Sequence, residues 1–132
     1  MTIEYVNPPE LARPSGFSHA VIATGRTVFL AGQTAVNDSG RIVGEDLVEQ
    51  FEQALTNLLT SLRAAGGDPS QLASLTIYIV DMEDYRAHSR QIGSVWKRLV
   101  GTSYPAMAGI GVSRLWDARA KVEIQGYAVL PT

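Results

Sequence analysis

Glu123 and His19 are the side chains whose chemistry stands out from their sequence surroundings. Glu123 lies in the apolar run "KVEIQGYAVL", where a carboxylate costs free energy to desolvate unless it is paired or functional. It could act on water as a general base, or it could be an ordinary residue on a solvent-facing strand. His19 opens the run "HAVIATG" and could transfer protons, because histidine changes charge near neutral pH. A histidine at the start of a strand more often only hydrogen-bonds a neighbouring loop.

Several other kinds of catalytic site are not supported by the spacing of their residues. Ser18 and His19 are adjacent, so on a strand their side chains point to opposite faces and cannot form a Ser–His pair. The two histidines, His19 and His88, are not at a metal-binding spacing. The sequence contains no cysteine and no glycine-rich phosphate loop. We therefore expect no metal site and no nucleophilic serine or thiolate.

Charged residues are nearly balanced, with 11 Lys and Arg against 13 Asp and Glu, for a formal net charge of −2. Because the basic residues are scattered rather than gathered in a stripe, nucleic-acid binding is not expected. Arg114, Arg119 and Lys121 surround the predicted last two strands. An arginine there could form a bidentate fork with a substrate carboxylate, or it could pair with Asp117 or Glu123.

Length and composition favour one compact domain over residues 1–132, because 45% of the residues are hydrophobic. No apolar run approaches the ~20 residues that cross a bilayer. The first residues lack the basic region and apolar core of a signal peptide. We therefore expect a cytoplasmic protein without a membrane segment.

Apolar periodicity predicts the element order strand, hairpin, helix, strand, helix, strand, strand. One helix should begin near Asp46 and end at Gly66–Gly67, and a second should follow Asp81 and stop near Gly101. The predicted strands are the first residues of "IEYVNPPELARPSG", a hairpin of residues 19–23 and 27–31, and residues 72–81, 105–115 and 119–130. Two helices cannot cover both faces of such a sheet, so they should share one face and leave the other to self-association.

Three long blocks resemble the RidA/YjgF/Rid family: "GFSHAVIATGRTVFLAGQTAVNDSGRI", "DLVEQFEQALTNLLTSLRAAGGDPSQLASLTIYIVDMEDY" and "YPAMAGIGVSRLWDARAKVEIQGYAVL". The resemblance implies an α+β, chorismate-mutase-like fold with a six-stranded, mostly antiparallel sheet and two helices on one face. It also implies a homotrimer with small-molecule clefts between its subunits. Its best-known members hydrolyse reactive imines and enamines to 2-oxo acids and ammonia.

The resemblance also implies which residues line these clefts. In the best-known members an arginine follows the Phe/Tyr-Pro-Ala triplet and binds the substrate carboxylate. Here Met107 follows the triplet 104–106, and a thioether cannot pair with a carboxylate. Glu123 matches the acidic residue that helps to activate water. Ser18 stands where the family has a tyrosine that lines the cleft, and Gly32 matches the position whose backbone faces the ligand. Arg90 stands where the family usually has a polar residue such as asparagine, and Gly109 stands where many members have a cysteine.

We therefore expect a homotrimer that needs no cofactor and acts on, or binds, a small metabolite whose polar end differs from a simple amino-acid carboxylate. As an enzyme it would hydrolyse a C=N or amide-like carbon, and Glu123 would deprotonate the water. His19 would relay protons, because its stretch "FSHAV" is similar to the one in branches of the family that lack the arginine. Arg90 or Arg114 could supply the missing positive charge. The alternative is a non-catalytic, metabolite-binding or regulatory trimer that lost deaminase activity when Met107 replaced the arginine. Ribonuclease activity, which has been attached to parts of the family, is disfavoured by the charge balance.

Overall fold

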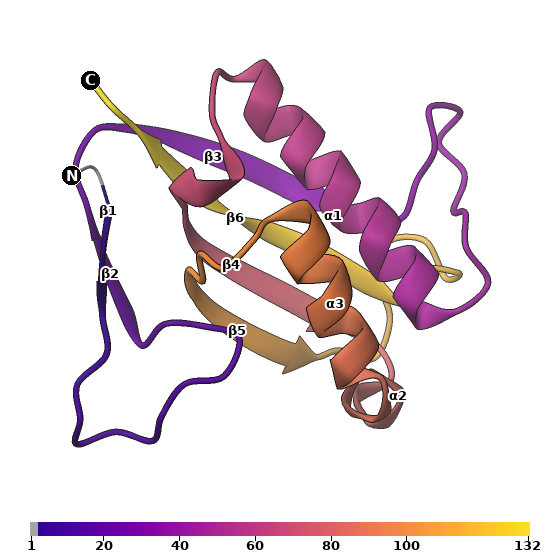
Figure 1. The fold of residues 1–132 in the computed structure, drawn as a ribbon. Helices are drawn as coiled ribbons and strands as arrows, with labels where there is room; N and C mark the ends of the chain where they lie inside the picture. The colour runs from indigo at the N-terminus through magenta and orange to yellow at the C-terminus, as the bar shows by residue number, and fades with distance from the viewer. Residues whose placement is uncertain (1–2) are drawn as a thin grey trace.

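The computed structural model describes residues 3–132 and has an α+β architecture (Figure 1). Its strands are β1 (Ile3–Val6), β2 (Ala20–Ala23), β3 (Arg26–Gln33), β4 (Leu72–Ile79), β5 (Ala106–Gly111) and β6 (Val122–Leu130). Its helices are α1 (Leu47–Ala64), α2 (Met82–Ala87) and α3 (Ser89–Leu99), with a short 3-10 turn at Pro69–Gln71. The predicted α+β class and the predicted number of strands are confirmed.

The strands form two sheets, which corrects the expectation of one six-stranded sheet. β3, β6, β4 and β5 lie in that order in the larger sheet, where only the β4–β5 pair is parallel. β1 and β2 form a separate antiparallel pair, drawn at the left of Figure 1. The sheets are mostly antiparallel, as predicted.

The predicted hairpin of residues 19–23 and 27–31 is wrong, because β2 pairs with β1 and β3 pairs with β6. Gly25 has a φ of +145° and lies so close to the Leu130 carbonyl that a Cβ would overlap it. A glycine at this point lets the chain pass from one sheet to the other instead of turning back on itself. The short strand of residues 3–6 then supplies the partner of β2.

α1 forms because its apolar residues fall on one helical face, and that face packs on the sheet. Its buried residues include Leu47, Phe51, Leu55 and Leu58. The Asp46 carboxylate caps the first turn by accepting a 2.9 Å hydrogen bond from the Glu49 amide, and this bond lowers the pKa of Asp46. The helix ends before Gly66, as predicted.

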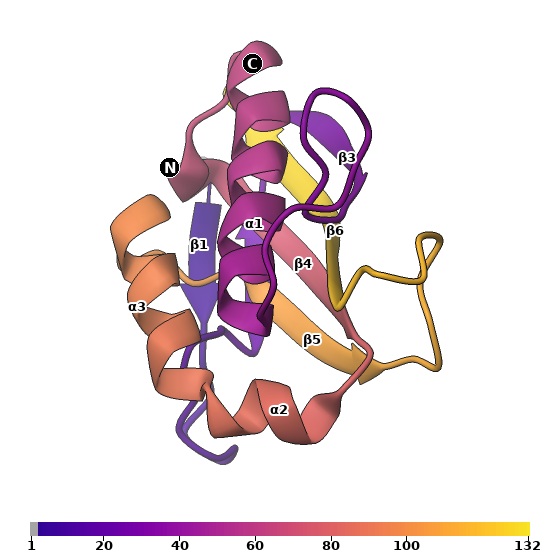
Figure 2. The ribbon, with the colours of Figure 1, turned by 90° about the vertical axis from the view of Figure 1, so that its right-hand side faces the viewer.

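The second predicted helix is divided at His88, so residues 3–132 form three α-helices rather than two. The backbone of His88 leaves helical geometry with φ −110° and ψ 20°, and its ring Nδ1 lies 2.9 Å from the Asp84 carbonyl. α1 and α3 lie next to each other over one face of the larger sheet (Figures 1 and 2). The expectation that the long helices share one face is therefore confirmed.

The opposite face of the larger sheet carries exposed apolar side chains, and we call it the open face. Phe29 is 76% exposed, Tyr127 42% and Ile110 44%. The Phe29 and Tyr127 rings form an edge-to-face pair with centroids 5.4 Å apart. Within residues 3–132, no helix has the length and apolar character required to cross a membrane.

Candidate functional site

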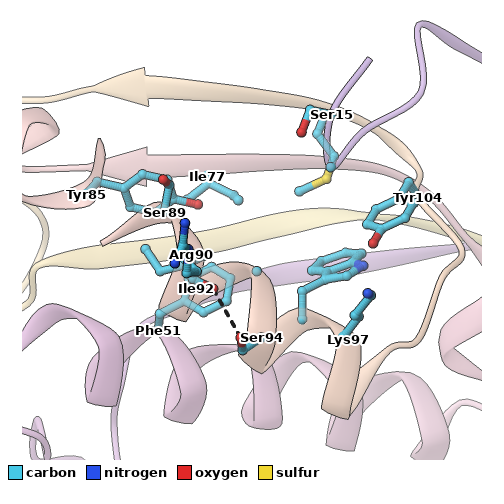
Figure 3. Close-up of a pocket in the computed structure, with 14 residues that line it drawn as sticks. Ser15, Phe51, Ile77, Tyr85, Ser89, Arg90, Ile92, Ser94, Lys97 and Tyr104 are labelled. Atoms are coloured by element: carbon cyan, nitrogen blue, oxygen red, sulfur yellow. Dashed lines mark hydrogen bonds between the residues drawn. The ribbon is translucent and has the colours of Figure 1, made fainter. Parts of the chain in front are cut away.

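A cleft of about 600 Å³ opens between α3, the edge strand β5 and the loop that precedes β2 (Figure 3). Its floor is apolar and aromatic, and its rim carries serines, glycines and two cations. The lining residues are Ser15, Gly16, Phe51, Ile77, Tyr85, Ser89, Arg90, Ile92, Gly93, Ser94, Trp96, Lys97, Tyr104 and Met107.

The strand register places Met107 in this cleft. Met107 pairs with Leu75 of β4, and Leu75 points into the core beneath the helices. Because cross-strand partners share a face of a sheet, Met107 also points to the helix side, where it packs partly buried against the core. The residue that replaces the family arginine is therefore part of the cleft.

Helical spacing places the cations on the rim. Arg90, Gly93, Ser94 and Lys97 follow one another at intervals of three, one and three residues, so they share one face of α3. The adjacent face of the helix buries Ile92, Val95 and Trp96. The Ser94 hydroxyl donates to the Arg90 carbonyl at 3.2 Å, as the dashed line in Figure 3 shows.

The electrostatics of the cleft favour an anion. No Asp or Glu is among its lining residues, and the three ion pairs found within residues 3–132 involve neither Arg90 nor Lys97. Tyr85 adds no negative charge at neutral pH, because a phenol is protonated there, and burial raises its pKa further, to about 12. Two positive charges thus face the cleft without a carboxylate beside them.

Trp96 and Tyr104 form an aromatic wall. Their rings are stacked, with centroids 6.2 Å apart and an interplanar angle of 14°. Trp96 is 5% exposed, and its Nε1 has no hydrogen-bond partner among residues 3–132. An unpaired buried donor of this kind costs about 1–3 kcal/mol.

Glu123 and Gly32 form a second group of predicted site residues, and it lies on the open face. Glu123 pairs with Tyr78 of β4, whose side chain points away from the helices. Gly32 lies at a bulge in β3, and a Cβ built on it would overlap Glu123 Oε2. The sheet separates this pair from Met107 in a single chain.

A buried glutamine fixes the chain immediately before β6, at Lys121, two residues before Glu123. Gln50 is 2% exposed and donates to the carbonyls of Gly44 at 3.1 Å and Arg119 at 3.2 Å. Its Oε1 accepts from the Lys121 amide at 2.8 Å. α1 therefore holds the chain that leads into the Glu123 strand.

Ser18 and His19 lie beside the cleft but are not among its lining residues. The buried Ser18 hydroxyl donates to the Tyr104 carbonyl at 2.6 Å and so ties the N-terminal loop to the start of β5. The His19 ring turns the other way, and its Nε2 lies 2.7 Å from the Ala12 carbonyl. This contact is the loop hydrogen bond that the sequence allowed as the alternative for His19.

Arg114 and Gly109 also lie outside the cleft of a single chain. The Arg114 guanidinium donates to the carbonyls of Leu115 at 3.1 Å and Trp116 at 3.3 Å in its own loop. Gly109 lies two residues beyond Met107 on the same face of β5. Of the residues predicted to bind substrate, the structure brings Arg90 and Met107 together in the cleft.

Residues 9–130 match the sequence model of the family described as Endoribonuclease L-PSP. Over 114 residues, 86% of this chain and 79% of the relative, the sequence is 34% identical to 2-iminobutanoate/2-iminopropanoate deaminase of Capra hircus. The chain belongs to the RidA/YjgF family. The family membership predicted from the sequence is confirmed.

Solved structures of the RidA/YjgF family have the same fold. A Rid-family protein of unknown function, YyfB from Yersinia pestis, is 37% identical and superimposes with a TM-score of 0.86 over 98% of this chain and all of its own. TdcF of E. coli, solved with bound serine, is 26% identical, with a TM-score of 0.69 over 89% of this chain and 91% of its own.

Sequence reasoning missed Lys97, Gly93 and Trp96 as cleft residues. Their spacing from Arg90 could have indicated Gly93 and Lys97, because both follow it at intervals that return to the same face of a helix. Trp96 has the spacing of the apolar face of the second predicted helix, which indicates burial and not a place in a cleft. Nothing in the sequence indicates that its indole nitrogen lacks a partner.

Proposed function

We propose that this protein is a cofactor-independent hydrolase of imines or enamines that carry a negative charge, and that it works as a homotrimer. The observation that carries the proposal is the division of the chemistry between two faces. The cationic cleft contains no carboxylate, while Glu123 lies on the open face beside Gly32. A site shared between copies is the arrangement that brings an anion-binding cleft to a water-activating carboxylate.

The reaction consumes one water molecule for each imine. The water oxygen attacks the C=N carbon while Glu123 accepts a proton from the water. That proton passes to the nitrogen and gives a carbinolamine, which carries a hydroxyl and an amino group on the same carbon. The hydroxyl proton then moves to the amino nitrogen, the C–N bond breaks, and ammonia leaves as the C=O bond of the 2-oxo product forms. His19 is proposed as a proton relay, and Ser18, Gly32 and Gly109 as parts of the wall.

Arg90 is proposed to bind the substrate carboxylate in place of the family arginine, so a simple carboxylate remains the charged end of the substrate despite the expectation drawn from Met107. Its guanidinium can form a bidentate fork, and Lys97 adds a second cation on the same helix face. Arg114 is the weaker choice, because carbonyls of its own loop already occupy two of its donors. The relatives named as 2-iminobutanoate/2-iminopropanoate deaminases support this class of substrate.

Self-association would cover the open face. Phe29, Ile110 and Tyr127 place exposed apolar area there, and removing such area from water favours association. A second copy that covers this face would also lie against Glu123. We further propose that the protein is cytoplasmic.

A non-catalytic trimer that binds a metabolite is the second candidate, and Met107 favours it. The thioether packs partly buried against the core at the position where deaminating relatives are expected to carry an arginine. In that case a ligand would bind the cleft and leave unchanged.

The test is release of ammonia and 2-oxo acid from 2-iminopropanoate generated in situ, compared with its spontaneous hydrolysis. Glu123→Gln should lower the rate by about 100- to 10,000-fold without changing the mass of the assembly. Arg90→Gln should raise KM by roughly 10- to 100-fold. The matched controls are Glu10→Gln and Arg41→Gln, which lie in exposed loops. No acceleration by the natural protein, or full activity of Glu123→Gln, would refute the proposal.

A further inference from the structure

Gly93 occupies an interior position of α3 where alanine would be more favourable. A Cβ built on Gly93 would meet nothing within 4 Å, so no neighbour in the chain requires the absence of a side chain. Its backbone does not have a positive φ, so the conformation does not require glycine either. Neither packing nor backbone geometry within the chain explains this residue.

The position of Gly93 in the cleft suggests a reason. It follows Arg90 by three residues and precedes Lys97 by four, so it forms a gap between the two rim cations. The α-helical rise places those two residues about 10 Å apart along the axis. A ligand whose charged end binds a rim cation can pass over the gap toward the floor.

The floor beneath the gap is apolar and larger than a small imino acid requires. Phe51, Ile77 and Met107 lie there, beside the stacked pair of Trp96 and Tyr104. In a single chain, before any second copy covers its open side, the cleft volume of about 600 Å³ is in the range of sites that hold drug-sized ligands, about 300–1,000 Å³. The iminopropanoate and iminobutanoate named for the relatives have chains of only three and four carbons.

We infer that the cleft selects 2-imino or 2-enamino acids with a bulky apolar side chain, aromatic side chains above all. The carboxylate binds Arg90 while Lys97 adds positive charge to the same rim, and the side chain passes Gly93 to reach Met107 and the aromatic wall. Thioether sulfur and aromatic rings both make favourable contacts with an aromatic group. This inference rests on the proposed function for the reacting group, but the preference for bulk is a property of the cleft.

The first test compares imines made in situ by an amino-acid oxidase from alanine and from phenylalanine. The phenylalanine-derived imine should be hydrolysed with kcat/KM at least about tenfold higher. Equal values, or a preference for the alanine-derived imine, would overturn the inference while leaving the proposed function intact.

The second test uses Gly93→Ala, with Ser61→Ala on the exposed face of α1 as its matched control. Both changes should stabilise their helices, and Gly93→Ala should raise Tm by roughly 2–4 °C. Only Gly93→Ala should lower kcat/KM for the phenylalanine-derived imine, by about tenfold, with a smaller effect on the alanine-derived imine. If Gly93→Ala leaves the ratio of the two substrates unchanged, or changes the mass of the assembly, the glycine does not serve the ligand.

Binding without turnover separates the two proposals. 3-Phenylpyruvate and pyruvate are titrated by calorimetry into the natural protein and into Gly93→Ala. Tighter binding of phenylpyruvate than of pyruvate, weakened in Gly93→Ala, supports the preference for bulk. If this binding result is found but no imine is hydrolysed, the proposed function is refuted and the preference for bulk stands. Equal affinity for the two 2-oxo acids contradicts the inference.

Discussion

Gly32→Ala should disable Glu123 without unfolding the protein. The Cβ of alanine would overlap Glu123 Oε2 and would lie 2.9 Å from Cδ, whereas ordinary contacts begin at 3.4 Å. The carboxyl carbon must therefore move by about 0.5 Å, and Oε2 must move farther. Gly32 does not have a positive φ and is exposed, so the backbone can accept alanine.

A displacement of about 1 Å in a reacting group can lower a rate by about 100-fold, and this is the expected loss of kcat/KM for Gly32→Ala. The assay is ammonia release from imines generated in situ. Gly111→Ala is the matched control on β5, because its Cβ would meet the nearest side-chain atom at 3.8 Å.

A double variant tests whether the loss acts through Glu123. If Gly32 matters because it leaves room for the carboxylate, Gly32→Ala should add little to the loss already caused by Glu123→Gln. Full activity of Gly32→Ala would refute the reasoning. So would losses that multiply in the double variant, because they would show that the two residues act independently.

Three further results are expected from the structure. Burial raises the pKa of Tyr85 to about 12, so the folded form holds this proton more tightly than the unfolded chain does. The free energy of unfolding should therefore fall by up to ~2 kcal/mol as pH rises from 10 toward 12. Urea titrations at several pH values should show that Tyr85→Phe lacks this part of the decline. Gln50→Ala should lower the free energy of unfolding by about 2–4 kcal/mol, because three buried hydrogen bonds are lost, whereas Gln53→Ala, measured in the same urea titrations, should cost less. Phe29→Asp should yield a folded single chain of 14.3 kDa in sedimentation experiments, and an unchanged larger mass would contradict the role of the open face.

The helices were predictable because their signals are local. The apolar residues from Leu47 to Leu62 repeat at helical spacing, and the capping carboxylate and terminal glycines mark the ends. The alternation along β6 likewise separated Val122 and Ile124 from Glu123, and the burial pattern of that strand agrees.

Strand pairing was less predictable because alternation does not name a partner. The sequence around Gly25 has the residue types of a tight turn, yet the glycine serves a close approach to Leu130, far away in the chain. The break at His88 coincides with a contact between its ring and the Asp84 carbonyl that apolar periodicity does not record. Both outcomes are set by contacts with other segments or side chains rather than by the hydrophobic pattern.

The candidate site was predictable only in part. The resemblance selected Met107 and Arg90, which meet in the cleft, and Glu123 and Gly32, which lie together on the other face of the sheet. It could not indicate that the cleft lacks a carboxylate or that Trp96 and Tyr104 stack, because these properties depend on packing between α3 and the start of β5.

The most direct test of the central claim is the rate of ammonia release from the alanine- and phenylalanine-derived imines by the natural protein and by Glu123→Gln at equal concentration. The account predicts that the natural protein accelerates release well beyond spontaneous hydrolysis and that Glu123→Gln loses this acceleration while keeping its assembled mass. If the natural protein leaves both spontaneous rates unchanged, it does not hydrolyse 2-imino acids of either size, and the proposed function is refuted.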